Sequence, residues 1–158
     1  MKKLEDYQVI WLTGQPGAGK TTIGNKIHSY IEQQCDKKAV IIDGDDIRLL
    51  FENKDYTIEG RQKNIIFVQK MVDFLVKNDI LPIVCLVSPF RTLREATKAK
   101  YDTLELYMVC NKIRGREKFH VDYYEPPLEK YIQLDTTIKS KNETFQELLT
   151  ISISKLDL

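Results

Sequence analysis

The chain has 158 residues, of which 42% are hydrophobic and 30% charged, a composition typical of one globular domain (residues 1–158) and unlike that of a disordered chain. Its 24 basic and 23 acidic residues leave a net charge of +1, which argues against a broad basic face and therefore against nucleic acid as the main partner. No apolar run approaches the roughly 20 residues that span a bilayer, and no apolar signal core follows the N-terminal lysines, so we expect a cytoplasmic protein without a membrane partner.

Five short apolar runs predict the strands of a buried sheet: residues 8–13, 39–43, 80–87, 104–109 and 131–135. Between and after them, helical spacing of apolar residues predicts a helix after the first run, others over about 59–77 and 92–100, and a closing helix around Phe145. Strands alternate with helices without a linker or repeat, which indicates a single α/β domain with a five-stranded, mainly parallel sheet flanked by helices. Such sheets bind ligands at the carboxyl ends of their strands, so the segments that follow the strands are the candidate sites.

A glycine-rich turn, GQPGAGKTT (residues 14–22), follows the first strand and fits the phosphate-binding pattern G-x-x-x-x-G-K-[ST]. The glycines let successive backbone N–H groups face phosphate oxygens, and the next helix adds its dipole. Lys20 would reach the β- and γ-phosphates of ATP, and the Thr21 hydroxyl would ligate Mg²⁺. A chance glycine turn is the alternative, but the flanking strand and amphipathic helix favour ATP and Mg²⁺ as cofactors. The predicted ATP-binding residues are Gly14, Gln15, Pro16, Gly17, Ala18, Gly19, Lys20, Thr21 and Thr22.

The second strand is followed by carboxylates in DGDDIR (residues 43–48). A metal-bound triphosphate needs a carboxylate nearby, to hold Mg²⁺ or to accept the proton of the acceptor hydroxyl. Asp43 and Asp45 are the candidates, and their i, i+2 spacing predicts that one of them faces the phosphates. The alternative is an Asp-Gly turn with a helix-capping carboxylate, which Asp46 alone could supply. The neighbouring phosphate-binding pattern favours Asp45 as a catalytic and metal-binding residue and Arg48 as a catalytic group that grips an anion.

Two later segments carry polar groups of weaker meaning. Arg61 and Asn64 are i, i+3 neighbours off the apolar stripe of the long helix, where a solvated helix start is the ordinary interpretation. In SPFR (residues 88–91), Ser88 either caps the next helix or, with Arg91, suits a phosphate or sulfate group.

A basic segment, NKIRGREKF (residues 111–119), follows the fourth strand. It is either a solvated surface turn or a flap that closes over an anionic substrate. Its position at the carboxyl-end rim favours the flap, because closing lids exclude water from transfer sites. The lid cations would be Lys112, Arg114, Arg116 and Lys118, with Arg114 or Arg116 touching phosphate.

In order along the chain, these segments resemble those of the adenylyl-sulfate (APS) kinase family of P-loop kinases. The resemblance rests on GQPGAGKTT, DGDDIR, R-x-x-N-I (61–65), SPFR, YEPP (124–127) and LDTT (134–137), and covers roughly residues 8–137. It implies a P-loop NTPase/kinase fold and transfer of the γ-phosphate of ATP to the 3′-hydroxyl of a small nucleotide, adenylyl sulfate, which gives the activated sulfate donor of sulfate assimilation. It also implies a possible homodimer.

The resemblance assigns roles to individual residues. Asp45 matches the family's catalytic, Mg-associated aspartate. Positions that hold the acceptor nucleotide, including one aromatic group on each side of its base, match Arg48, Tyr56, Arg61, Asn64 and Phe119. Ser88 matches a serine that we expect to contact the substrate rather than to carry a phosphate, because direct in-line transfer needs no relay.

The chain departs from the family pattern on the acceptor side. Segment 111–119 is shorter than the family's lid and lacks its Arg-Asp pair and Lys-Gly-Leu-Tyr motif, and Ile66 and Phe67 replace a basic pair. A sibling kinase acting on another modified nucleotide, such as a cytidine diphosphate-linked phosphoramidate, therefore remains open beside adenylyl sulfate. A non-catalytic nucleotide-sensing module is disfavoured because the transfer residues are present, and a generic small-molecule P-loop kinase is disfavoured by the ordered motifs.

Overall fold

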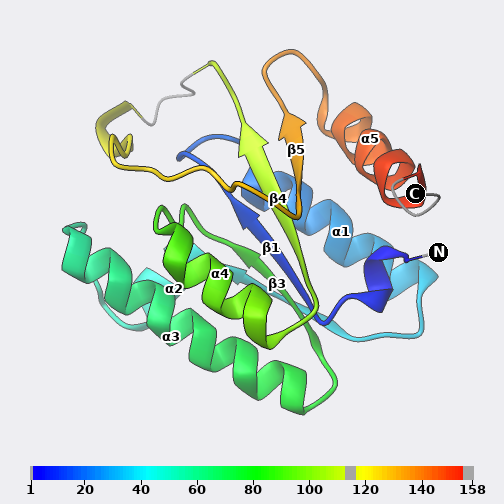
Figure 1. Cartoon of the computed structure of the whole chain (residues 1–158), viewed down its shortest axis with the longest axis horizontal. Coiled ribbons are helices and arrows are strands. Elements are labelled where there is room, and N and C mark those ends of the chain that lie inside the picture. Colours follow the sequence, from blue (N-terminus) through cyan, green and yellow to red (C-terminus); the bar gives the residue numbers. More distant parts are fainter. Residues whose placement is uncertain (1, 113–116, 155–158) are drawn as a thin grey trace.

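The computed structural model describes residues 2–112 and 117–154, which form one five-stranded sheet between two layers of helices (Figure 1). The strands are β1 (Val9–Thr13), β2 (Ala39–Asp43), β3 (Leu81–Cys85), β4 (Thr103–Val109) and β5 (Tyr131–Asp135). All four pairings are parallel, and the strand order is β2-β3-β1-β4-β5. The predicted P-loop kinase type of α/β fold is confirmed, and the sheet is parallel throughout.

Each face of the sheet has its own apolar core. Ile10 and Leu12 of β1 pack under α1 (Lys20–Gln34) and α5 (Lys141–Ser154). Val9 and Trp11 point to the opposite face, because successive strand residues alternate. That face is covered by α2 (Gly44–Leu50), α3 (Ile58–Lys77) and α4 (Arg91–Lys100). Two short 3₁₀ helices, η1 (Leu4–Asp6) and η2 (Glu117–Phe119), complete the elements.

The strand order places the candidate segments together. After β3 the chain crosses to the other side of β1 to add β4 and β5, so the topological switch point adjoins β1. Ligands bind at such points, beyond the carboxyl ends of the strands. The turns after β1, β2 and β3 therefore share one edge of the sheet.

The third strand is shorter than the prediction for residues 80–87, and the first and fourth strands differ from theirs by one residue at the start. β3 ends at Cys85, and Ser88 adopts a left-handed φ of 40° that turns the chain away from the sheet. Such a conformation is uncommon for a side chain larger than glycine, and tertiary contacts described below hold it.

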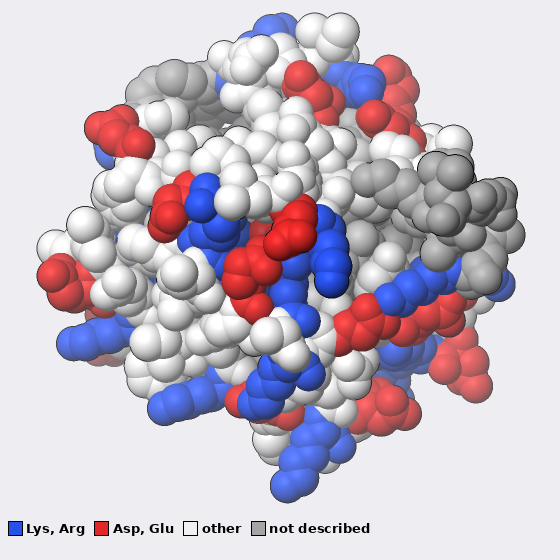
Figure 2. Space-filling model, viewed as in Figure 1, with Lys and Arg blue, Asp and Glu red and all other residues white. Residues whose placement is uncertain are grey.

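The charge distribution matches the balanced composition. Basic and acidic side chains are interspersed over the face seen in Figure 2 rather than separated into large fields. Within residues 2–112 and 117–154, no helix is both long and apolar enough to cross a bilayer.

Candidate active site

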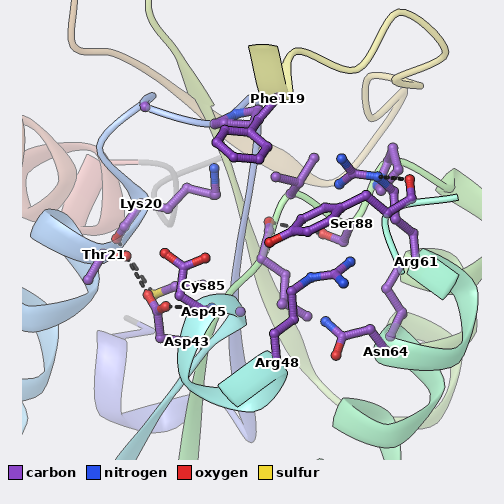
Figure 3. A pocket seen from close by; sticks show the side chains of 18 of the residues that line it. Lys20, Thr21, Asp43, Asp45, Arg48, Arg61, Asn64, Cys85, Ser88 and Phe119 are labelled. Atoms are coloured by element: carbon purple, nitrogen blue, oxygen red, sulfur yellow. Dashed lines mark hydrogen bonds between the residues drawn. The ribbon is translucent and has the colours of Figure 1, made fainter. Parts of the chain in front are cut away.

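A cavity of about 350 Å³ opens at the carboxyl edge of the sheet. Its wall brings together the turns after β1, β2 and β3, the start of α3, and η2 (Figure 3). Most of the predicted site residues line it: Pro16, Gly17, Gly19, Lys20, Thr21, Thr22, Asp45, Arg48, Tyr56, Arg61, Asn64, Ser88 and Phe119. In Figure 3, Lys20 and Thr21 lie at one side of this cavity, while Arg61 and Asn64 stand on α3 at the other.

The phosphate loop (residues 14–21) has the backbone geometry that its glycines allow. Gly14 has a φ of 151°, and a Cβ there would lie 2.3 Å from the Met108 carbonyl oxygen, so only glycine fits. The Lys20 ammonium lies inside the curl of the loop, where Nζ donates to the carbonyl oxygens of Gly14 at 2.9 Å and Gln15 at 2.7 Å. The loop therefore positions a buried cation at the mouth of α1, where an anion is favoured.

Two carboxylates, not one, line the cavity beside Thr21. Asp43 accepts hydrogen bonds from the Thr21 hydroxyl and, at 2.9 Å, from the backbone N–H of Asp45. Asp43 is thus the N-cap of α2, and not Asp46, which the alternative interpretation offered for this cap. Asp43 and Asp45 both line the cavity, and the expectation that only one of them faces the phosphates stays a prediction. The turn that starts α2 aims both side chains the same way.

These oxygen atoms suit a magnesium ion. The Thr21 hydroxyl and the two carboxylates are hard ligands of the kind that Mg²⁺ prefers, and Mg²⁺ keeps waters and substrate phosphates as its other ligands. In the part of the chain that the structure describes, no cluster of three or more His, Cys, Asp or Glu side chains could hold a metal by protein groups alone. The donor set fits an ion that arrives with a nucleotide.

The far side of the cavity combines guanidinium groups with aromatic rings. The Arg48 guanidinium lies 3.9 Å from the Tyr56 ring centroid and donates to the Asp55 carbonyl oxygen at 2.9 Å. Burial lowers the pKa of the Arg48 guanidinium from its ordinary value. Arg61 lies 5.4 Å from the same ring and donates from Nε to the Tyr56 carbonyl oxygen at 3.3 Å. Both cations therefore lie at one aromatic surface.

Phe119 lies against Tyr56, with ring centroids 5.6 Å apart and planes inclined by 41°. The two rings come from distant parts of the sequence and close one end of the cavity. Asn64 is only 5% exposed, and its amide makes no hydrogen bond with another described residue. A buried amide of this kind is available to a ligand.

The Ser88 hydroxyl is engaged inside the protein. It accepts from the Trp11 indole N–H at 2.9 Å and lies 3.1 Å from the Thr13 hydroxyl and 3.2 Å from the Leu86 carbonyl oxygen. Its predicted contact with a substrate remains a prediction. The suggested anion contact of Arg91 is not supported, because this side chain lies outside the cavity wall and donates to the Pro126 carbonyl oxygen at 2.8 Å.

The basic segment is described only at its ends. Lys112 and Lys118 are exposed, and neither lines the cavity. Lys118 Nζ lies 5.1 Å from the Phe119 ring centroid. Arg114 and Arg116 lie outside the described residues, so the choice between flap and surface turn remains a prediction.

The sequence analysis missed an ion-pair network behind the cavity. Arg94 and Glu105 are each 1% exposed, with Nε 2.7 Å from Oε1. Arg94 also donates to the carbonyl oxygens of Ser88 and Glu125, both at 2.6 Å, and so helps to hold Ser88 in its left-handed conformation. The signal was Glu105 itself, a charge within the apolar run LELYMV, since a buried charge requires a partner.

A second missed contact joins the phosphate loop to the chain beyond the basic segment. The Gln15 side chain donates to the Val121 carbonyl oxygen at 2.8 Å and accepts from the Val121 N–H at 2.9 Å. Nearby, the Thr13 hydroxyl lies 2.8 Å from the Tyr124 hydroxyl. Neither pairing has a local sequence signal, because each joins residues more than a hundred positions apart.

Comparisons with known proteins place the chain in one family. The sequence model of the adenylylsulphate kinase family matches residues 6–142. A probable adenylyl-sulfate kinase of Pyrococcus abyssi is 36% identical over 154 residues, covering 85% of this chain and 88% of the relative. The adenylyl-sulfate kinase of Thermodesulfovibrio yellowstonii is 30% identical over 173 residues, covering 95% of this chain and 86% of that enzyme.

Solved structures show the same fold. The APS kinase of Mycobacterium tuberculosis in complex with AMPPNP and APS superposes with a TM-score of 0.75 at 20% identity, over 92% of this chain and 97% of that one. A gluconokinase from Sinorhizobium meliloti gives a TM-score of 0.61 at 15% identity, over 94% and 91% of the two chains. The structural likeness establishes a kinase fold shared by more than one family, and the sequence match selects among them: the chain belongs to the adenylylsulphate kinase family.

Proposed function

We propose that this protein transfers the γ-phosphate of ATP to the 3′-hydroxyl of adenylyl sulfate. The observation that carries the proposal is the single cavity that joins a phosphate loop to a cationic and aromatic wall made of Arg48, Tyr56, Arg61 and Phe119. The relatives' names and the solved complex with AMPPNP and APS support this pairing of substrates.

On the donor side, the phosphate loop would bind the triphosphate of ATP. Its backbone N–H groups and the start of α1 favour anionic oxygens, and Lys20 already lies within the loop. To reach the β- and γ-phosphates, the ammonium would exchange the Gly14 and Gln15 carbonyl oxygens for phosphate oxygens. Lys20 would then neutralise the charge that shifts toward the leaving oxygen.

Thr21, Asp43 and Asp45 would hold Mg²⁺, directly or through water. When bound, Mg²⁺ would supply positive charge that offsets the negative charge of the phosphate oxygens during transfer. The Asp43 carboxylate contacts Thr21 and caps α2, so its main task is to orient that hydroxyl and the following turn. Asp45 then aligns the acceptor hydroxyl and accepts its proton.

On the acceptor side, Arg48 and Arg61 would hold the anionic linkage of the nucleotide, and Asn64 would hydrogen-bond to it. The Tyr56 and Phe119 rings contact each other at 5.6 Å, whereas a base stacked between two rings needs them about 7 Å apart. Phe119 would therefore move away from Tyr56 as the base enters. Such a movement at the end of the basic segment fits its proposed role as a lid.

An acceptor panel tests the proposal. Purified protein with ATP and Mg²⁺ is offered adenylyl sulfate and then cytidine and uridine diphosphate derivatives, while ADP release is followed. We expect release that depends on adenylyl sulfate. Release with a pyrimidine derivative alone would assign the sibling activity, and no release with any acceptor would support the sensing module. The family resemblance also suggests a homodimer, which sedimentation of the purified chain would test.

A further inference from the structure

The Gln15 side-chain amide forms hydrogen bonds with both the backbone C=O and the backbone N–H of Val121, as a neighbouring β-strand would. Its amide N–H donates to the Val121 carbonyl oxygen at 2.8 Å, and its amide oxygen accepts the Val121 N–H at 2.9 Å. The partners fix the orientation of the amide, because one backbone group must accept and the other must donate. Val121 is 2% exposed, and it lies two residues after Phe119.

The other end of Gln15 belongs to the phosphate loop. Its backbone carbonyl oxygen accepts from Lys20 Nζ at 2.7 Å. One residue thus contacts the ammonium expected to bind phosphate and also the backbone that leads out of η2.

From this geometry we infer that Gln15 is a positioning residue for the acceptor: it ties the chain after η2 to the phosphate loop and so keeps Phe119 near enough to Tyr56 for the two rings to stack on a base between them. The inference rests on the proposed function, because Phe119 matters through the acceptor base. It assigns Gln15 a task beyond lining the ATP site, one carried by its side chain rather than by its backbone.

Replacing the Gln15 side chain should loosen only the part of residues 119–125 that lies next to η2. Two other contacts hold the segment farther along, from Thr13 to the Tyr124 hydroxyl at 2.8 Å and from Arg94 to the Glu125 carbonyl oxygen at 2.6 Å. Residues 124 and 125 therefore stay attached when the Gln15 side chain is replaced. Phe119 lies beyond these contacts, where the pairing at Val121, the buried Val121 side chain and the contact with the Tyr56 ring restrain it among the described residues.

The test compares Gln15→Met with Gln15→Glu. Methionine has a similar length but makes neither hydrogen bond, whereas glutamate keeps the acceptor for the Val121 N–H and sets a charge against the Val121 carbonyl oxygen. Gln33→Met, at an exposed position of α1, is the matched control. For Gln15→Met we expect the KM for adenylyl sulfate to rise about tenfold, the effect of one to two lost hydrogen bonds. The KM for ATP should rise less than the KM for adenylyl sulfate, because the loop backbone is unaltered.

Hydrogen exchange supplies a readout that does not depend on activity. In the wild-type chain Gln15 protects the Val121 amide, so Gln15→Met should speed its exchange about tenfold while Gln33→Met leaves it unchanged. Unchanged exchange at Val121 would overturn the inference whatever the substrate. Faster exchange with an unchanged acceptor KM, or an equal rise of both KM values, would also overturn it and leave Gln15 a merely structural role. A wild-type protein that shows no activity on adenylyl sulfate would refute the proposed function instead. Because the exchange rate at Val121 does not depend on activity, it tests the Gln15 contact separately.

Discussion

The Arg94 guanidinium and the Glu105 carboxylate form an ion pair that is almost entirely out of contact with water, at 2.7 Å and with 1% of either side chain exposed. Lys98 bonds the second carboxylate oxygen at 2.7 Å, and Arg94 reaches two backbone carbonyl groups. One buried network thus joins α4 and β4 to the turn after β3 and to the chain beyond the basic segment. The cavity wall on that side depends on it.

Breaking this network should strongly destabilise the fold. Glu105→Gln leaves the Arg94 charge buried without its partner, so we expect a loss of about 3 to 5 kcal/mol in the free energy of unfolding, measured by urea denaturation. Lys100→Met, which removes the exposed pair with Asp73, is the control and should destabilise the fold far less, because solvent screens that pair. Equal effects of the two variants would contradict the role assigned to burial.

Asp45→Asn should lower kcat at least about a hundredfold, on the order of 3 kcal/mol of transition-state stabilisation, because the amide neither accepts the hydroxyl proton nor carries a charge. Steady-state kinetics with saturating ATP and adenylyl sulfate measure this. Asp43→Asn serves for comparison: it weakens the Thr21 contact and the α2 cap, so it should also lower stability by about 1 kcal/mol. Near-normal turnover of Asp45→Asn would remove that residue from the mechanism.

Tyr56→Ala should raise the KM for the acceptor by about 10- to 100-fold, since stacking of an aromatic ring on a base contributes about 1–3 kcal/mol. Tyr56→Phe keeps the ring and should stay within about threefold of the wild type, because the ring is what stacks. Tyr123→Ala is a matched control, since Tyr123 is also partly exposed but stacks on Phe90 outside the cavity wall. If Tyr56→Ala and Tyr123→Ala behave alike in acceptor titrations, the base does not stack on Tyr56.

Cys85 lines the cavity but should be chemically inert. Burial raises the pKa of its thiol to about 12, so the group is protonated in the native protein at pH 8 and its thiolate form is rare. We expect maleimide at pH 8 to modify the half-buried Cys110 at least about tenfold faster than Cys85, as read by mass spectrometry of peptides. In denaturant the two should react alike, and equal rates in the native protein would show that Cys85 is accessible.

The same pKa shift sets the direction of a stability effect. The folded-state pKa of Cys85 is raised above its usual value of 9.0, so above pH 9 the unfolded chain releases this proton first. Stability should therefore fall as pH rises from about 9 to 12, and Cys85→Ala should reduce that fall. An identical pH dependence of the variant and the wild type would contradict the shift.

Local patterns predicted what depends on neighbouring residues. The apolar runs located all five strands, and the most continuous of them belong to β1 and β3, which are buried at every position. The glycines and Lys20 located the phosphate loop, since its backbone can take that form only at those spacings. The pattern could not say which of three aspartates caps α2, because that depends on how the chain turns out of β2, and Asp43 proved to be the cap.

The sequence by itself therefore determined the fold class, the phosphate loop and the edge of the sheet where the site lies. Only the tertiary structure decided which distant side chains meet there. Gln15 hydrogen-bonds to Val121, Tyr56 contacts Phe119, and Arg94 pairs with Glu105, because the strand order brings their elements together. Periodicity records which face of an element is buried, but a polar contact requires two specific groups within about 3 Å, and that distance is set by the packing of the whole chain.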